Sequence, residues 1–314
     1  MELIRNFSKL GKGNAGIAGG KGASLGEMTS AGIPVPPGFV ILAESFEQFL
    51  RENQIEADID SILSKVNQKD INSVDGASAE IQSIILNSKM PADIETEILK
   101  HFAELDAEFV AVRSSATAED GSSASWAGEL ESYLNTTREN LLENVQKCWA
   151  SLFTPRAIFY RIEKNMHKDK VSVAVVIQKM VESEVSGICF TVHPVTEDHN
   201  QMVLEAGWGL GEAIVGGLIT PDNYVVDKKN LEITDKYISE QSIKIVRQNN
   251  GTAEMEVAES RREVQKLSDG GIIELAKICL QIEKHYGFPC DIEWAYEKGK
   301  FYIVQSRPIT TLSI

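Results

Sequence analysis

The sequence VAVRSSATAEDGSSASWAG, residues 110–128, joins a short apolar run to a polar, hydroxyl-rich segment. A buried strand that runs into such a segment usually delivers a loop to a site. The segment carries six serines and threonines besides Arg113, whose planar guanidinium suits phosphate oxygens. The pattern predicts a strand over 109–112 and a loop from Arg113 onward. Two interpretations of the loop remain open: a phosphate site, or a solvated loop in which Arg113 makes a surface ion pair.

The composition is that of an ordinary soluble protein, with 43% hydrophobic and 25% charged residues. The 314 residues are enough for one large domain or two smaller lobes. A net charge of −15 argues against nucleic acid and against an anionic membrane surface as partners. A polyphosphate substrate would need a local basic pocket or Mg²⁺. The four cysteines show no CxxC spacing, which indicates buried free thiols. Together with the lack of a signal peptide and of a long apolar run, this predicts a cytoplasmic protein.

A glycine-rich segment precedes the first strand. Residues 10–26 read LGKGNAGIAGGKGASLG and contain seven glycines. Backbone N–H groups of such a loop can approach a phosphate, and Lys21 would add charge. The Walker A pattern fails, however, because Ala15 replaces its first glycine and Gly22 replaces its Ser or Thr. On these residues alone, a flexible turn with a solvated Lys21 is favoured, followed by a short helix over 23–31.

Apolar periodicity predicts the remaining elements of the first half. Residues 171–181, VSVAVVIQKMV, form a continuous apolar run that indicates a strand buried on both faces. Gln178 stands out in it, either as a satisfied buried amide or as a contact to a base or sugar. The other expected elements are strands at 39–42 and 130–135, a helix at 43–52, three or four helices over 55–105, and a helix over 137–163 that Pro155 breaks.

The second half reads as short strands followed by a helix and a hairpin. Strands are expected at 186–192 and 201–206, a meander at 222–227, 242–246 and 254–257, and an amphipathic helix at 267–286. Between them, residues 207–217 read GWGLGEAIVGG. Glu212 stands where a dinucleotide fingerprint would have its third glycine, so that fingerprint is not supported. A glycine-rich turn that opens a helix can still face an anion.

The terminal hairpin has the most informative alternation. Strands are expected over 290–296 and 301–307. In the first strand, alternation places Asp291, Glu293 and Ala295 on one face. In the second strand, it places Phe301, Ile303, Gln305 and Arg307 on one face. Glu293, Gln305 and Arg307 should therefore project together. Mg²⁺ is usually held by one or two protein carboxylates plus phosphate oxygens, which Glu293 could supply. The alternative is a cross-strand Glu–Arg pair on a sheet surface.

Taken together, these residues form the inventory that Mg·ATP chemistry requires. Lys21, Arg113 and Arg307 are cations, Glu293 is a metal ligand, and two segments are rich in glycine. Phosphoryl transfer depends mainly on positioning and on neutralising charge, and this set supplies both.

The motifs also resemble those of one family. They are GGKGASLGEM at 19–28, IPVPPGF at 33–39, VAVRSSATAED at 110–120, SWAGELESYLN at 125–135, SGICFTVHPVT at 186–196, WGLGEAIVGG at 208–217 and DIEWAYEKGKFYIVQSRP at 291–308. In this order the chain resembles the N-terminal nucleotide-binding part of the phosphoenolpyruvate synthase and pyruvate phosphate dikinase family, including the related rifampin phosphotransferases. The resemblance implies an α+β ATP-grasp fold, two lobes with mixed or antiparallel sheets and flanking helices. Lobe 1 would span residues 1–185, with a helical insertion at about 55–105, and lobe 2 residues 186–314.

The resemblance also implies a reaction. ATP is cleaved to AMP, and its β-phosphate passes to a histidine on a swivelling domain, for phosphoenolpyruvate synthesis from pyruvate (a pyruvate, water dikinase). Lys21 and Arg113 would hold phosphates and act in catalysis, and Gln178 would contact the nucleoside. Gly128 and Ser132 would line the site, and Ser132 stands where Thr is common in the family. Glu293 and Glu212 would bind metal. Gln305 and Arg307 would complete the phosphate end of the site.

One departure from the family concerns its phosphorylated histidine. That residue has a Thr-Ser-His setting, which none of the five histidines here shares: His101, His167, His193, His199 and His285. The sequence therefore predicts that a histidine domain and a pyruvate- or phosphoenolpyruvate-binding domain act in trans or in the remainder of a longer chain. Two alternatives stay open: the ATP-binding domain of a rifampin phosphotransferase, and a stand-alone nucleotide-binding or regulatory protein.

Overall fold

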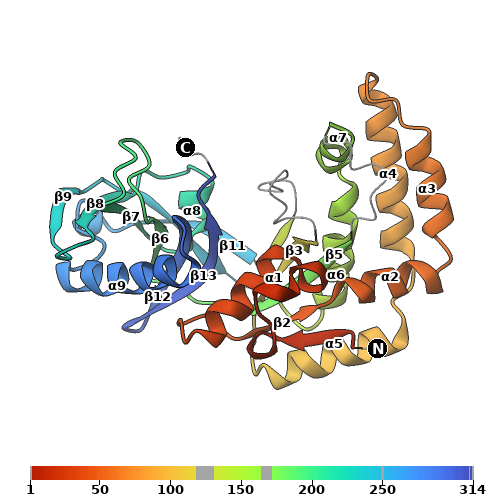
Figure 1. The fold of residues 1–314 in the computed structure, drawn as a ribbon, viewed down its shortest axis with the longest axis horizontal. Helices are drawn as coiled ribbons and strands as arrows, with labels where there is room; N and C mark the ends of the chain where they lie inside the picture. The colour runs from red at the N-terminus through yellow and green to blue at the C-terminus, as the bar shows by residue number, and fades with distance from the viewer. Residues whose placement is uncertain (1, 118–130, 164–171, 249–250, 311, 313–314) are drawn as a thin grey trace. The chain divides into compact units, whose positions relative to one another are not determined.

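The computed structural model describes residues 2–117, 131–163, 172–248, 251–310 and 312 (Figure 1). The chain divides into two compact units. Unit 1 comprises Met1–Glu27 and Pro37–Met180, and unit 2 comprises Met28–Pro36 and Val181–Ile314.

Unit 1 is built on a five-stranded antiparallel sheet with the order β1-β2-β5-β3-β4. The strands are β1 (Ile4–Asn6), β2 (Gly38–Ile41), β3 (Val110–Ala116), β4 (Ser132–Thr136) and β5 (Val173–Lys179). The apolar run of β5 lies at the centre of the sheet, and its residues 173–178 are all buried, as the sequence predicts.

Helices flank both faces of this sheet. They are α1 (Ala15–Ser30), α2 (Ala43–Glu52), α3 (Glu56–Ser64), α4 (Ile71–Asn87), α5 (Ala92–Glu104), α6 (Leu141–Ala150) and α7 (Pro155–Glu163), with short 3-10 turns at Phe7–Lys9, Lys12–Asn14 and Ser151–Phe153. Helices α2 to α7 contribute side chains to one apolar core together with Phe39, Val112 and Ile177 of the sheet. Helix α1 lies against the opposite face, where Gly22 contacts Val40.

Two predictions in unit 1 are wrong. The glycine-rich segment is not a flexible turn, because helix α1 begins at Ala15 and bends at Gly19, whose φ is +68°. Strand β3 does not end before Arg113 but continues to Ala116. Its extra residues stay in the strand because each pairs with β5, Ser114 opposite Val175 and Ser115 opposite Ala174.

Unit 2 contains a six-stranded antiparallel sheet with the order β13-β12-β6-β7-β8-β9. Its strands are β6 (Val185–Phe190), β7 (Gln201–Trp208), β8 (Asp222–Asp227), β9 (Ile233–Tyr237), β12 (Cys290–Glu297) and β13 (Lys300–Pro308). A separate hairpin is formed by β10 (Ile243–Gln248) and β11 (Gly251–Glu256). The helices are α8 (Glu212–Val215) and α9 (Asp269–Tyr286), with a 3-10 turn at Glu259–Arg261.

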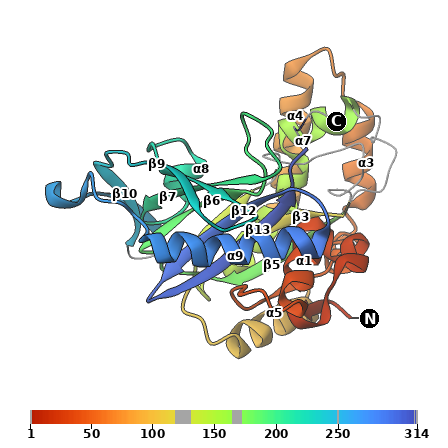
Figure 2. The same cartoon turned by 60° about the vertical axis from the view of Figure 1, so that its left-hand side comes forward.

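Helix α9 runs along one face of the six-stranded sheet (Figure 2). Ser268 caps its first turn by accepting the Gly271 N–H at 3.2 Å, and Gly287 ends it in the left-handed conformation. The buried free thiols predicted from the sequence are confirmed, because Cys148, Cys189, Cys279 and Cys290 are all buried and unpaired. Burial raises the pKa of Cys148 and of Cys290 to about 12.

The predicted meander is only partly right. Strands β10 and β11 leave the main sheet and pair with each other. Strand β9 was not predicted, because its sequence ITDKY is largely polar and its residues are mostly exposed at the edge of the sheet. The α+β class with antiparallel sheets and flanking helices is confirmed.

Candidate functional site

One face of the unit 1 sheet gathers three of the residues predicted from the sequence. Ser132 is the cross-strand partner of Arg113, and Val176 is the partner of Arg113 on its other side. Directly paired residues and residues two apart along a strand share a face. Arg113, Ser132 and Gln178 therefore lie on the same face, on which helix α1 also packs through Gly22 and Val40. Gly128 lies outside the described residues.

The side chains of Arg113 and Gln178 meet on this face. The Arg113 Nη1 donates to the Gln178 Oε1 at 3.4 Å. Gln178 is only 1% exposed, and its Nε2 has no hydrogen-bond partner among the described residues. A buried donor without a partner costs about 1–3 kcal/mol, so this amide is ready for an acceptor from a bound molecule. The interpretation of Gln178 as a satisfied buried amide is therefore disfavoured.

Lys21 reaches the same part of the sheet from helix α1. Its Nζ donates to the backbone carbonyl of Ser114 at 2.8 Å, one residue beyond Arg113. The ammonium is held against the sheet and is not solvated on a flexible turn. The structure thus brings Lys21 close to the strand position of Arg113.

In unit 2, the hairpin of β12 and β13 places four polar residues on one face. Glu293 pairs with Gln305, and the Gln305 Nε2 donates to the Glu293 Oε1 at 3.2 Å. The next pair on this face is Asp291 with Arg307, joined by an ion pair of 2.7 Å. The predicted meeting of Glu293 with Gln305 is confirmed, but Arg307 pairs with Asp291.

The predicted alternation of β13 is wrong. Gln305 faces Glu293, whereas Ile303 faces Trp294, so Val304 is an extra residue between the two pairs. This bulge turns Phe301 and Ile303 to the buried face while Gln305 and Arg307 stay on the polar one. The two halves of β13 therefore do not share one face.

Glu205 belongs to the same polar face and was not predicted. It pairs with Ile188, which in turn pairs with Glu293 across β6. The only sequence signal was one carboxylate within the apolar strand QMVLEAGW. Burial, and to a smaller extent the Asp291 carboxylate, raise the pKa of Glu205 above its ordinary value of 4.5.

We expect the raised pKa of Glu205 to appear in the pH dependence of stability. The folded state binds this proton more tightly than the unfolded state, so the stabilisation is complete below the ordinary pKa and is lost as pH rises through the raised one. Glu205→Gln should therefore raise the melting temperature at about pH 8 and leave it unchanged at about pH 4. Thermal unfolding at both pH values checks this, with Glu254→Gln on exposed β11 as control. An equal shift at both pH values would contradict it.

Glu212 begins helix α8 within the glycine-rich turn after β7. The turn depends on Gly209, whose φ is +90° and where a Cβ would lie 2.4 Å from the Ile245 carbonyl oxygen. Among the described residues, no group of three or more His, Cys, Asp or Glu side chains could hold a metal ion alone. The assignment of Glu293 and Glu212 as metal ligands stays a prediction.

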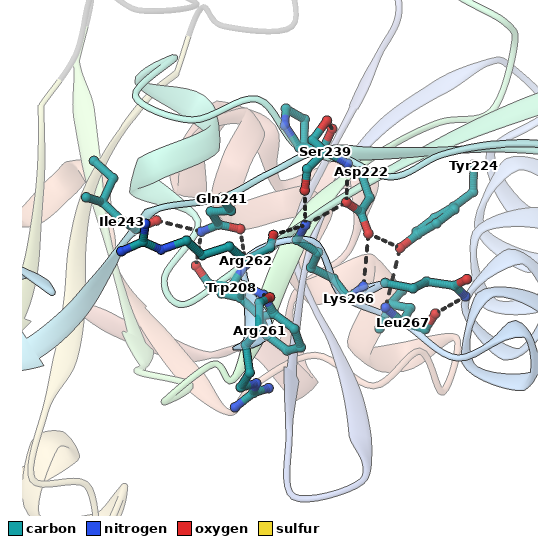
Figure 3. A network of polar contacts seen from close by, with 12 residues as sticks. Trp208, Asp222, Tyr224, Ser239, Gln241, Ile243, Arg261, Arg262, Lys266 and Leu267 are labelled. Atoms are coloured by element: carbon teal, nitrogen blue, oxygen red, sulfur yellow. Dashed lines mark hydrogen bonds and ion pairs between the residues drawn. The ribbon is translucent and has the colours of Figure 1, made fainter. Parts of the chain in front are cut away.

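A buried polar network supports this turn (Figure 3). The Gln241 side chain accepts the Trp208 N–H at 2.8 Å and donates to the Trp208 carbonyl at 3.0 Å. Beside it, Lys266 and Asp222 form an ion pair of 2.8 Å in which both side chains are 0% exposed. Tyr224 donates to Asp222 at 2.6 Å, and burial together with this carboxylate raises the pKa of Tyr224. The backbone before Glu212 is therefore fixed from within the unit.

Comparison with known proteins decides the family. Residues 15–314 match the family described as "Pyruvate phosphate dikinase, AMP/ATP-binding domain". The chain belongs to this family. Its α+β architecture with antiparallel sheets is that of the ATP-grasp fold of this domain.

Relatives carry two different names. A probable phosphoenolpyruvate synthase of Methanocaldococcus jannaschii is 48% identical over 99% of this chain and 27% of its own length. The phosphoenolpyruvate synthase of Pyrococcus furiosus is 41% identical over 99% of this chain and 44% of its own length. The rifampicin phosphotransferase of Bacillus cereus is 40% identical over 99% of this chain and 36% of its own length. The chain thus spans less than half the length of each of these relatives.

The length and composition of the helices decide whether any of them could cross a membrane. Within the described parts of the chain, none has both the length and the apolar character needed to cross a bilayer. The cytoplasmic location stays a prediction.

Proposed function

We propose that this chain binds Mg·ATP and transfers its β-phosphate to a histidine of a separate domain, releasing AMP. The observation that carries the proposal is the face of the unit 1 sheet on which Arg113 donates to the buried Gln178 and Lys21 is anchored one residue from Arg113. This arrangement occurs in a chain whose residues 15–314 match an AMP/ATP-binding domain.

The unit 1 residues would each bind a different part of the nucleotide. The unpartnered Nε2 of Gln178 would donate to an acceptor of the base or sugar. Arg113 and Lys21 would neutralise phosphate oxygens. The exposed Ser132 would line the site, as would Gly128, which lies outside the described residues. These roles suit phosphoryl transfer, in which the protein mainly positions the reacting groups and neutralises charge.

The unit 2 residues fit a magnesium ion. The Glu293 carboxylate, held by Gln305 at 3.2 Å, offers one firmly oriented oxygen ligand. Because Mg²⁺ takes one or two protein carboxylates and completes its shell with water and phosphate oxygens, it needs no cage of three acids. Glu293 would hold the ion, with Glu212 as a second ligand, and Gln305 and Arg307 would complete the phosphate end. Bound there, the ion would neutralise charge on the phosphate oxygens.

The transfer balances as follows. The bond between the β-phosphorus and the oxygen bridging it to the α-phosphate breaks, and AMP leaves with that oxygen. The histidine nitrogen forms a new bond to the β-phosphorus. Since AMP and phosphohistidine account for two of the three phosphorus atoms, the γ-phosphate leaves as inorganic phosphate after attack by water. The phosphohistidine would then phosphorylate its acceptor on another domain.

The acceptor that we favour is pyruvate, giving phosphoenolpyruvate. Its support is the name phosphoenolpyruvate synthase, which relatives that are 48% and 41% identical to this chain carry. The alternative acceptor is a hydroxyl of rifampicin, supported by the 40% identity to a rifampicin phosphotransferase over 99% of this chain.

The test uses ATP labelled at the β-phosphate. The chain is mixed with Mg²⁺ and with a histidine domain taken in turn from the Methanocaldococcus synthase and from the Bacillus phosphotransferase. We expect AMP, label on one of the two domains, and loss of both signals when Mg²⁺ is chelated. ADP in place of AMP would overturn the proposed chemistry. Tight ATP binding with no label on either domain would favour a nucleotide-binding regulatory protein instead.

The same label then identifies the acceptor. Each labelled histidine domain is supplied with its own acceptor domain and with pyruvate or rifampicin. Label that moves only to pyruvate supports the synthase assignment, and label that moves only to rifampicin supports the alternative.

A further inference from the structure

Helix α1 is fastened to strand β3 where it bends. Gly19 has a φ of +68°, and a Cβ at this position would lie 2.2 Å from the Ser115 Oγ and 2.4 Å from the Ser115 carbonyl oxygen. No side chain fits in this space, so only glycine allows the helix to approach the strand so closely. The bend also divides α1, and a regular helix resumes after Gly19.

The Ser115 hydroxyl accepts a hydrogen bond from the first turn of this second helical part. The first N–H groups of a helix have no partner within it, and a serine oxygen usually satisfies one of them from the preceding residue. Here the oxygen comes from another element, because the Ser115 Oγ accepts the Gly22 N–H at 3.2 Å. Ser115 is 0% exposed, and it lies on the same face of β3 as Arg113, two residues away. Ser115 thus caps the helix turn that carries Lys21.

These contacts fix the main chain on both sides of Lys21. Gly19 packs on Ser115, Gly22 donates to Ser115, and the Lys21 Nζ donates to the carbonyl of Ser114. We propose that Ser115 is a positioning residue, which holds the start of the second part of α1 so that the Lys21 ammonium meets a nucleotide phosphate beside Arg113. The inference rests on the proposed function, and it assigns no contact between Ser115 and the nucleotide.

If Ser115 positions Lys21, replacing Ser115 should weaken only the binding of the nucleotide phosphates. Ser115→Ala leaves the Gly22 N–H without its acceptor and loosens the turn that carries Lys21. We expect the affinity for Mg·ATP to fall about tenfold, while the affinity for adenosine, which has no phosphate, stays within about twofold. Calorimetry on both ligands gives the ratio of the two affinities. A structural defect alone would lower both affinities together.

A matched control removes a buried hydroxyl from the other side of the same sheet. Ser45 of helix α2 is 0% exposed, and its Oγ donates to the Leu3 carbonyl at 2.8 Å. Ser45→Ala should destabilise the unit and leave the ratio of the ATP and adenosine affinities unchanged. Ser115→Cys, whose sulfur is larger than the hydroxyl oxygen but keeps a weak acceptor, should give an intermediate ratio and serves if Ser115→Ala fails to fold.

A double-mutant cycle decides whether the effect passes through Lys21. In a Lys21→Ala background, Ser115→Ala should cost no further affinity for Mg·ATP, because the group that it positions is already gone. Independent, additive losses would overturn the inference. If the natural chain binds ATP no more tightly than adenosine, the proposed function itself fails. If it does prefer ATP but Ser115→Ala keeps the same preference, only the positioning role fails.

Discussion

Replacing Lys266 with methionine should lower the free energy of unfolding of unit 2 by about 3–5 kcal/mol. The ammonium of Lys266 is 0% exposed and forms an ion pair of 2.8 Å with Asp222. Without it, Asp222 remains a buried carboxylate whose other donors among the described residues are neutral, namely the Tyr224 hydroxyl and the backbone N–H groups of Ser239 and Lys266. Breaking a buried pair by removing one partner is costly because the other charge stays buried.

The control for this prediction is an exposed pair in the same unit. Lys236 and Asp269 form an ion pair in which the side chains are 33% and 64% exposed. Lys236→Met should cost only about 0–1 kcal/mol, because exposed pairs are screened by solvent. Denaturant unfolding followed by tryptophan fluorescence measures both variants, since Trp208 and Trp294 report on unit 2. Equal losses in the two variants would contradict the role assigned to the buried pair.

A double variant separates charge from packing. Asp222→Asn combined with Lys266→Met removes both charges, and we expect it to recover part of the stability that Lys266→Met loses. No recovery would mean that the loss comes from the packing of the lysine stem. The Arg262 carbonyl accepts both from the Lys266 Nζ at 3.5 Å and from the Gln241 N–H at 2.9 Å. Because Gln241 in turn bonds to Trp208, the single variant should loosen the turn that leads to Glu212.

Elements with a strong apolar pattern could be predicted from the sequence. Helix α2 has the predicted bounds Ala43–Glu52, and β5 is the predicted buried strand, because long periodic segments follow their own pattern. The boundary at 185/186 between the two ATP-grasp lobes stays a prediction, and so do the roles of all the site residues.

Other features depend on contacts that the local sequence does not contain. The seven glycines of residues 10–26 argue against a helix, yet α1 forms because Gly19 and Gly22 fit closely against β3 and β2. The bulge at Val304 is invisible to a count of alternating residues, since it is defined by the pairing with β12. Ser115 and Glu205 become candidates only through their neighbours in space.

Replacing Arg113 with alanine should abolish β-phosphate transfer while leaving unit 1 folded. Arg113 lies on the face of β3 that is turned away from the apolar core, so its loss leaves no cavity in that core. Removing a charged donor to the reacting phosphates typically slows the chemical step on the order of 10²–10³-fold. Transfer of the β-label to the histidine domain gives the rate, and circular dichroism verifies the fold.

Two further variants show which property of Arg113 matters. Arg113→Lys keeps the charge but loses the planar fork that contacts two phosphate oxygens at once, so we expect only a small part of the transfer rate to return. Arg51→Ala removes an arginine of helix α2 that is 50% exposed and paired with Glu44, and it should transfer phosphate at the normal rate. Normal transfer by Arg113→Ala would rule out its phosphate role. Full activity of Arg113→Lys would mean that only the positive charge of Arg113 matters. Lys21, whose Nζ is held on the Ser114 carbonyl, supplies a charge of the same kind.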